Sequence, residues 1–163
     1  MCGIVGFTGN DIKKVKSLQK TLKHRGPDGE GSYSDMHISL AHTRLSITDP
    51  SVAGHQPMFY IPDKGACSAK FQSNLIQDAD IAIVYDGEIY NFREVRSLLH
   101  GKGYKFATEC DTELILAAYS EWGTNFLDRL NGVWAFCLYD KKNEALFLSR
   151  DRMGIKPLYY YFD

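Results

Sequence analysis

The sequence carries almost no net charge: 19 basic and 20 acidic residues give a formal charge of −1 over 163 residues. It therefore has no overall electrostatic attraction to nucleic acid or to a membrane surface. It also lacks any apolar run near the ~20 residues that a membrane span needs. The chain does not open with the basic and apolar segments of a secretory signal. We expect a cytoplasmic protein with neither nucleic-acid nor membrane partners.

Cysteine and histidine are too scattered to form a metal site or a disulfide framework. The sequence contains no C-x-x-C and no H-x-x-x-H, two spacings that zinc ligands often have. The four cysteines are Cys2, Cys67, Cys110 and Cys137. We predict reduced thiols and a domain without a metal or organic cofactor.

The chain does have enough apolar material for a core. Apolar residues make up 44% of it and aromatic residues 13%, which indicates one globular domain over residues 1–163. A domain of this size buries roughly two thirds of its unfolded surface. The chain closes on the apolar run "LYYYFD" without a polar tail. We therefore expect it to have been cut from a longer protein.

Apolar residues occupy both alternating faces of the last three predicted strands. These strands are "GVWAFCLYD", "EALFLSRD" and "LYYYFD" at residues 132–140, 144–151 and 158–163. In the first, Trp134, Phe136 and Leu138 are expected on one side, with Val133, Ala135 and Cys137 on the other. Such strands are covered on both faces. Two stacked sheets with helices outside them satisfy this pattern.

Other segments alternate between helix, strand and loop signals. Asn10 or Asp11 can cap a helix with an apolar face and a lysine-rich face, which we interpret as solvent-exposed. The apolar face is expected to carry Ile12, Val15, Leu18 and Leu22. The Pro- and Gly-containing stretch 51–78 is predicted to be a surface loop. A strand is expected to end in a turn at Asp86-Gly87, and helices are expected at 92–103 and 112–123.

Cys2 directly follows the initiator methionine and precedes the apolar strand "GIVGF". If Met1 is removed, Cys2 carries both a thiol and a free α-amine. Their pKa values are ordinarily about 8.5 and about 8, so the amine can accept the thiol proton near neutral pH. Taken alone, the position still favours a small core residue over a nucleophile.

Seven motifs, in this order, give the chain a family resemblance. They are "MCGIVGF", "HRGPDGEG", "LAHTRLSITD", "GEIYN", "CDTELIL", "GVWAFCLYD" and "RDRMGIKPLYY". The chain resembles the N-terminal glutaminase domain of asparagine synthetases, a class II (type 2) glutamine amidotransferase domain. This resemblance implies an α+β fold, the four-layer αββα sandwich of N-terminal-nucleophile hydrolases.

The resemblance also implies a site for L-glutamine. Cys2 matches the nucleophile that forms a γ-glutamyl thioester and releases ammonia, and Arg44 matches the group that holds the α-carboxylate. A guanidinium suits a carboxylate because it can pair with it bidentately. Glu88 and Asp111 match positions that meet the α-ammonium, although Asp111 could instead cap a helix. The resemblance further places these residues along the site: Leu45, Ser46, Ile47 and Thr48.

One position departs from the family pattern. The family has Asn-Gly-Glu where this chain has Asp86-Gly87-Glu88, and its asparagine and glycine form the oxyanion hole. An ionised aspartate only accepts hydrogen bonds, and losing one such donor typically costs ~10²–10³ in rate. Three explanations stay open: an inactivating substitution, a natural variant with altered activity in which Asp86 could stay protonated, or a deamidated asparagine. Asp-Gly is also a favourable turn pair.

The resemblance implies a synthetase domain that is absent from these 163 residues. ATP and Mg²⁺ are expected only there, and the ammonia would be used there to make asparagine. A rival hypothesis is a catalytically impaired domain that binds glutamine or a partner protein. N-terminal-cysteine hydrolases of the penicillin and bile-salt type also begin Met-Cys, but they lack the "HTRLSI" arginine and the "CDTE" segment. Retention of Met1 would block the α-amine in either enzyme.

Overall fold

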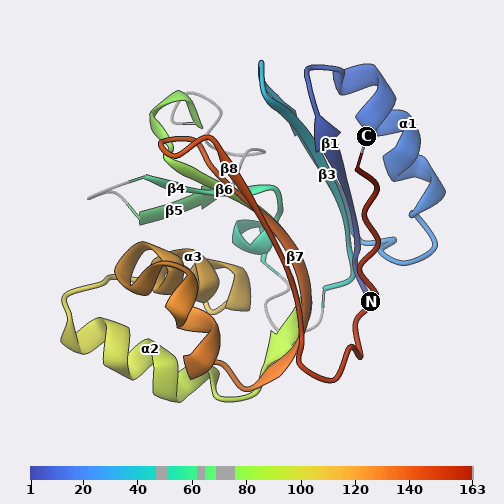
Figure 1. The fold of residues 1–163 in the computed structure, drawn as a ribbon. Helices are drawn as coiled ribbons and strands as arrows, with labels where there is room; N and C mark the ends of the chain where they lie inside the picture. Colours follow the sequence, from blue (N-terminus) through green and yellow to red (C-terminus); the bar gives the residue numbers. More distant parts are fainter. Residues whose placement is uncertain (47–50, 62–64, 69–75, 163) are drawn as a thin grey trace.

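The chain folds into four layers, with two antiparallel sheets stacked between helices (Figure 1). This computed structural model describes residues 1–46, 51–61, 65–68 and 76–162. Helix α1 (Ile12–Thr21) lies outside one sheet, whereas α2 (Phe92–Gly101) and α3 (Asp111–Trp122) lie outside the other. The predicted αββα sandwich is confirmed.

The smaller sheet has the strand order β1-β3-β2 and the larger one β5-β4-β6-β7-β8. The smaller sheet consists of β1 (Gly3–Thr8), β2 (Gly29–Ser34) and β3 (Ile38–Arg44). The larger sheet consists of β4 (Met58–Ile61), β5 (Gly65–Ser68), β6 (Ile81–Ile89), β7 (Gly132–Asp140) and β8 (Ala145–Arg150). Short 3-10 helices are η1 (Val52–Gly54), η2 (Ile76–Asp78) and η3 (Gly123–Arg129).

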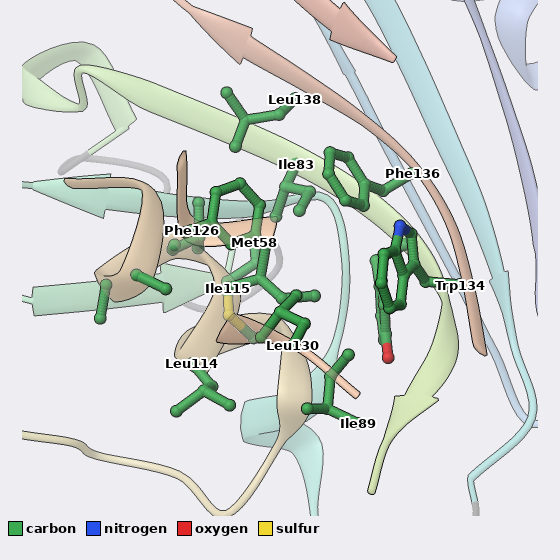
Figure 2. Packing of buried hydrophobic residues seen from close by; sticks show 14 of the residues in the cluster. Met58, Ile83, Ile89, Leu114, Ile115, Phe126, Leu130, Trp134, Phe136 and Leu138 are labelled. Atoms are coloured by element: carbon green, nitrogen blue, oxygen red, sulfur yellow. The ribbon is translucent and has the colours of Figure 1, made fainter. Parts of the chain in front are cut away.

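Side-chain alternation along β7 separates two hydrophobic clusters. Trp134, Phe136 and Leu138 pack on the helix side with Phe126 of η3 (Figure 2). Cys137 instead packs on the side that faces the smaller sheet. The period of two residues therefore produces both interior layers, as the sequence predicts.

The Asp86-Gly87 turn predicted from the sequence is wrong. Both residues lie inside β6, where Asp86 pairs with Ala135 and Gly87 with Trp134. A Cβ atom on Gly87 would lie 2.4 Å from the Val133 carbonyl oxygen, so glycine is needed here for the close approach of two strands. This continuity matters for the site because it holds Asp86 on a rigid strand.

The loop predicted for 51–78 is also wrong in part, because β4 and β5 lie within it. Met58, Phe59 and Ile61 of β4 are buried, and the strand pairs with both β5 and β6. A four-residue strand gives little periodic signal, and the surrounding Pro and Gly residues favour loop.

Residues 158–162 do not form the strand predicted there; Tyr159 is 92% exposed. Their apolar composition favoured a strand, but in the described structure they form no ladder with a neighbour. The strand predicted at 144–151 is confirmed as β8. The expected burial of both its faces is wrong. Leu146 and Leu148 pair with Tyr139 and Cys137 and so lie on the side of the smaller sheet, yet they are 41% and 42% exposed. β8 is the edge strand of the larger sheet.

Helix α1 begins as predicted, since the Asp11 carboxylate caps it by accepting a hydrogen bond from the Lys14 N–H at 2.8 Å. Its predicted apolar face is only partly right, because Ile12 and Leu18 are 36% and 37% exposed. The buried residues are instead Val15 and Gln19. The Gln19 amide replaces apolar burial with hydrogen bonds to two carbonyl oxygens of the smaller sheet.

Candidate functional site

Cys2 immediately precedes β1 and lies next to Leu45, the residue that follows β3. The Leu45 N–H donates to the Cys2 Sγ at 3.4 Å, and the Sγ lies 3.7 Å from the Leu45 carbonyl oxygen. Burial raises the pKa of the Cys2 thiol and the charge of Asp86 raises it further, whereas the Leu45 hydrogen bond and Lys156 lower it. The thiol therefore depends on a base to become a nucleophile.

Asp86 connects the backbone of Cys2 to two cations. Its Oδ1 accepts from the Cys2 N–H at 2.9 Å and lies 3.3 Å from the Lys156 Nζ. Its Oδ2 lies 3.3 Å from the Arg25 guanidinium, whose Nε donates to the Cys2 carbonyl oxygen at 2.9 Å. Each of these contacts complements a negative charge. The cluster thereby fixes Cys2 at both its N–H and its C=O.

Asp111 does not cap a helix, so the capping alternative is wrong. Cys110 is the N-cap of α3, and Asp111 Oδ2 accepts from the Ile89 N–H at 2.9 Å and from the Tyr85 hydroxyl at 3.3 Å. Burial raises the pKa of Asp111 to about 6, against the opposing effect of these two hydrogen bonds, and the charge of Glu88 adds to the rise. Burial and Asp111 together raise the pKa of Tyr85 well above its ordinary value.

Arg44 ends β3 and is only 6% exposed. Its Nη1 donates to the Ser51 carbonyl oxygen at 2.7 Å. Arg44 is therefore a buried residue.

A pocket of about 140 Å³ brings most of the predicted residues together. Its lining includes Cys2, Arg44, Leu45, Asp86, Gly87, Glu88 and Asp111. Ser46 does not line it; its N–H donates to the Asp28 carboxylate at 2.8 Å. Ile47 and Thr48 lie outside the described residues. The pocket thus has a thiol, one predicted cation for a carboxylate and two anions for an ammonium.

Five further polar residues of this lining had no role in the sequence analysis: His42, Gln56, Tyr85, Thr112 and Lys156. Gln56 binds the Tyr85 backbone through both its side-chain oxygen and nitrogen, at 2.6 and 3.1 Å, and so supports β6 behind the pocket. Burial lowers the pKa of His42 to about 3, and its Nε2 has no hydrogen-bond partner in the described structure. His42 and Lys156 lie inside motifs that carry the family resemblance, in the segments "AHTR" and "GIKP". The sequence of these segments does not indicate which residues the two side chains contact.

The described part of the chain contains no cluster of three or more His, Cys, Asp or Glu side chains that could hold a metal ion. No helix among these residues is both long and apolar enough to cross a membrane.

A solved amidotransferase shares this layered architecture. The structure of the glutamine phosphoribosylpyrophosphate amidotransferase from Bacillus subtilis, complexed with ADP and GMP, matches with a TM-score of 0.71. The match covers 96% of this chain and 38% of that one at 16% identity. At this identity the likeness shows the fold alone, and it defines the class of the chain as this αββα sandwich.

The family follows from the sequence comparisons. The glutamine amidotransferase domain model matches residues 1–163, and the chain belongs to this family. A Methanocaldococcus jannaschii protein is 42% identical over all of this chain and 32% of its own length. Asparagine synthetase B [glutamine-hydrolyzing] of Escherichia coli is 40% identical over 100% of this chain and 27% of its own length. Asparagine synthetase [glutamine-hydrolyzing] 3 of Bacillus subtilis is 36% identical over 98% and 25%. The chain thus spans a third or less of these relatives.

Proposed function

We propose that this domain hydrolyses L-glutamine to glutamate and ammonia through a thioester at Cys2. The observation that carries the proposal is one small pocket that joins Cys2 to a buried arginine and a buried aspartate. Arg44 would bind the α-carboxylate of glutamine, and Asp111 with Glu88 would bind its α-ammonium. These three charges fit a zwitterionic amino acid and leave its side-chain amide for the thiol.

The reaction requires that Met1 be removed. The α-amine of Cys2 then accepts the thiol proton, and Sγ attacks the amide carbon of glutamine. The C–N bond breaks as the amine returns the proton, so ammonia leaves and the thioester remains. Water, deprotonated by the same amine, then adds to the thioester and releases glutamate and the thiol. The Gly87 N–H is the proposed backbone donor to the oxyanion.

In a longer parent protein, we infer that the ammonia passes to a C-terminal synthetase domain that makes asparagine. Two of the relatives named above are glutamine-hydrolyzing asparagine synthetases by name. ATP and Mg²⁺ would serve that domain, and the glutaminase step itself would use no metal or organic cofactor. Such a parent would be a cytoplasmic ligase.

The first test is glutamate release from glutamine by protein whose intact mass shows that Met1 is absent. Cys2→Ala is the matched control, because it removes only the sulfur atom. Turnover that disappears in Cys2→Ala supports the proposal, and turnover that persists in that variant contradicts it. Glutamine binding without turnover in the unsubstituted chain would instead favour the impaired, glutamine-binding alternative.

A further inference from the structure

Asp86 presents the proposed reaction with an electrostatic problem. The tetrahedral intermediate places a negative charge near Cys2, and Asp86 lies at the same wall of the pocket with a carboxylate that donates no hydrogen bond. A group with N–H donors and a positive charge would solve this problem. Lys156 lines the same pocket, and its Nζ lies 3.3 Å from the Asp86 oxygen that accepts from Cys2.

The position of Lys156 is fixed by the turn that precedes it. Asp151 is 3% exposed and its carboxylate accepts four backbone hydrogen bonds. The donors are the N–H groups of Trp134, Met153, Ile155 and Lys156, at 3.3, 3.2, 2.9 and 2.9 Å. Burial opposes the ionised form of Asp151, but these four donors together lower its pKa.

This turn also favours a glycine. Gly154 has a φ of 65°, in the left-handed region where other residues are strained. The segment after β8 passes close to the N-terminus (Figure 1). The Lys156 side chain is 12% exposed, so little solvent competes for its ammonium group.

We propose that Lys156 is a catalytic residue of the glutaminase reaction and supplies the oxyanion donor that Asp86 cannot. The inference rests on the proposed function. An ammonium has three N–H donors, so Lys156 can bind Asp86 with one and the oxyanion with another. As the S–C bond forms, the carbonyl π electrons move to the oxygen, which accepts from Lys156 and the Gly87 N–H. When the C–N bond breaks, the electrons return. Lys156 stays protonated throughout.

Arg25, the other cation at Asp86, is a poorer candidate. Its Nε is used by the Cys2 carbonyl oxygen, and Arg25 is not among the described residues that line the pocket. Its contacts with Asp86 and with the Cys2 carbonyl oxygen hold Cys2 in place.

A double-mutant cycle between Lys156→Met and Asp86→Asn tests the proposal. Methionine keeps the unbranched side chain and removes the ammonium. With Asp86 present, Lys156→Met should lower kcat by about 10²–10³-fold, the usual cost of one oxyanion donor, with little change in KM. In the Asp86→Asn background the amide itself can donate, and the loss should fall below about tenfold. Lys156→Arg, which keeps a charged donor, should recover part of kcat.

Lys141→Met is the matched control, since the Lys141 Nζ instead donates to the Ile76 carbonyl oxygen and lies outside the pocket lining. It should leave kcat unchanged. Each variant is also checked for its melting temperature and for alkylation of Cys2 by a diazoketone analogue of glutamine, so that a misfolded protein is recognised.

The outcomes separate the two proposals. An equal loss in both backgrounds, no loss at all, or a change in KM alone overturns the role of Lys156 and leaves the glutaminase proposal standing. An inactive unsubstituted chain with an active Asp86→Asn variant overturns the role of Lys156, because the lysine then fails to compensate, and it also favours the impaired, glutamine-binding alternative for this chain. No glutamate release by either chain overturns both.

Discussion

Glutamine binding should weaken in acid because of Asp111. Burial raises the pKa of Asp111 to about 6, and the residues facing its carboxyl group are Tyr85, Ile89 and Glu88. Only the ionised carboxylate can pair with the α-ammonium of glutamine. We therefore expect Kd to be flat above about pH 7 and to rise about tenfold for each pH unit well below about 6.

The assay is calorimetric titration of glutamine into Cys2→Ala, in which no turnover interferes. Between about pH 7.5 and about pH 5, Kd should rise by about tenfold, as expected for a group that titrates near 6. Asp111→Asn, which preserves the shape of the side chain, should bind weakly and without this pH dependence. A Kd that stays constant to about pH 5, or an unchanged pH profile in Asp111→Asn, would refute the role assigned to Asp111.

The same pKa shift predicts a cost in stability. The pKa of Asp111 is raised in the folded state from an ordinary value of 3.8, so the folded protein binds this proton more tightly. The bound proton stabilises the folded protein fully below about pH 3.8, and this stabilisation is lost as the pH rises through about 6. About two units at about 1.4 kcal/mol each give about 3 kcal/mol. Urea unfolding should therefore show Asp111→Asn to be more stable at neutral pH, with a gain that disappears toward about pH 4.

Two further predictions concern the thiol and the core. The charge of Asp86 raises the pKa of the Cys2 thiol and that of Lys156 lowers it. The rate of Cys2 alkylation by iodoacetamide, followed by mass spectrometry, rises with pH as the thiol ionises. The pH at which this rate is half its maximum should be lower in Asp86→Asn and higher in Lys156→Met than in the unsubstituted chain. A shift in the same direction in both variants would contradict this. Phe126 is fully buried, so Phe126→Ala should cost about 3–5 kcal/mol in urea unfolding, whereas a loss below about 1 kcal/mol would mean that the cluster repacks.

The parts of the fold that the sequence predicts best are those with a strong local signal. The alternation along β7 predicts a two-faced strand, and it separates Trp134 from Cys137 as observed. Glycines just beyond the apolar runs predict the ends of helices; Gly123 follows α3 with a φ of 54°. Local patterns of this kind depend on a few neighbouring residues, which is why they can be read without the structure.

The misses depend on distant partners. The Asp86-Gly87 pair has the composition of a turn, and only pairing with β7 makes it part of a strand. From the sequence alone, Gln19 is predicted to be a polar surface residue, because the carbonyl oxygens to which its amide donates belong to distant strands. Lys156 has the same limitation, because it meets Asp86 across 70 residues of sequence. No local period encodes contacts that tertiary packing creates.

The charges around Cys2 are best understood as a set. Arg25 and Lys156 both contact Asp86, so the three groups sum to one positive charge beside the thiol. An oxyanion that forms there reduces this sum to zero. With asparagine in place of Asp86, the same two cations would face each other without a counterion, and each would have to find another partner or more water. The two cations therefore more than offset the charge of Asp86, and the fold brings them to it from both ends of the chain.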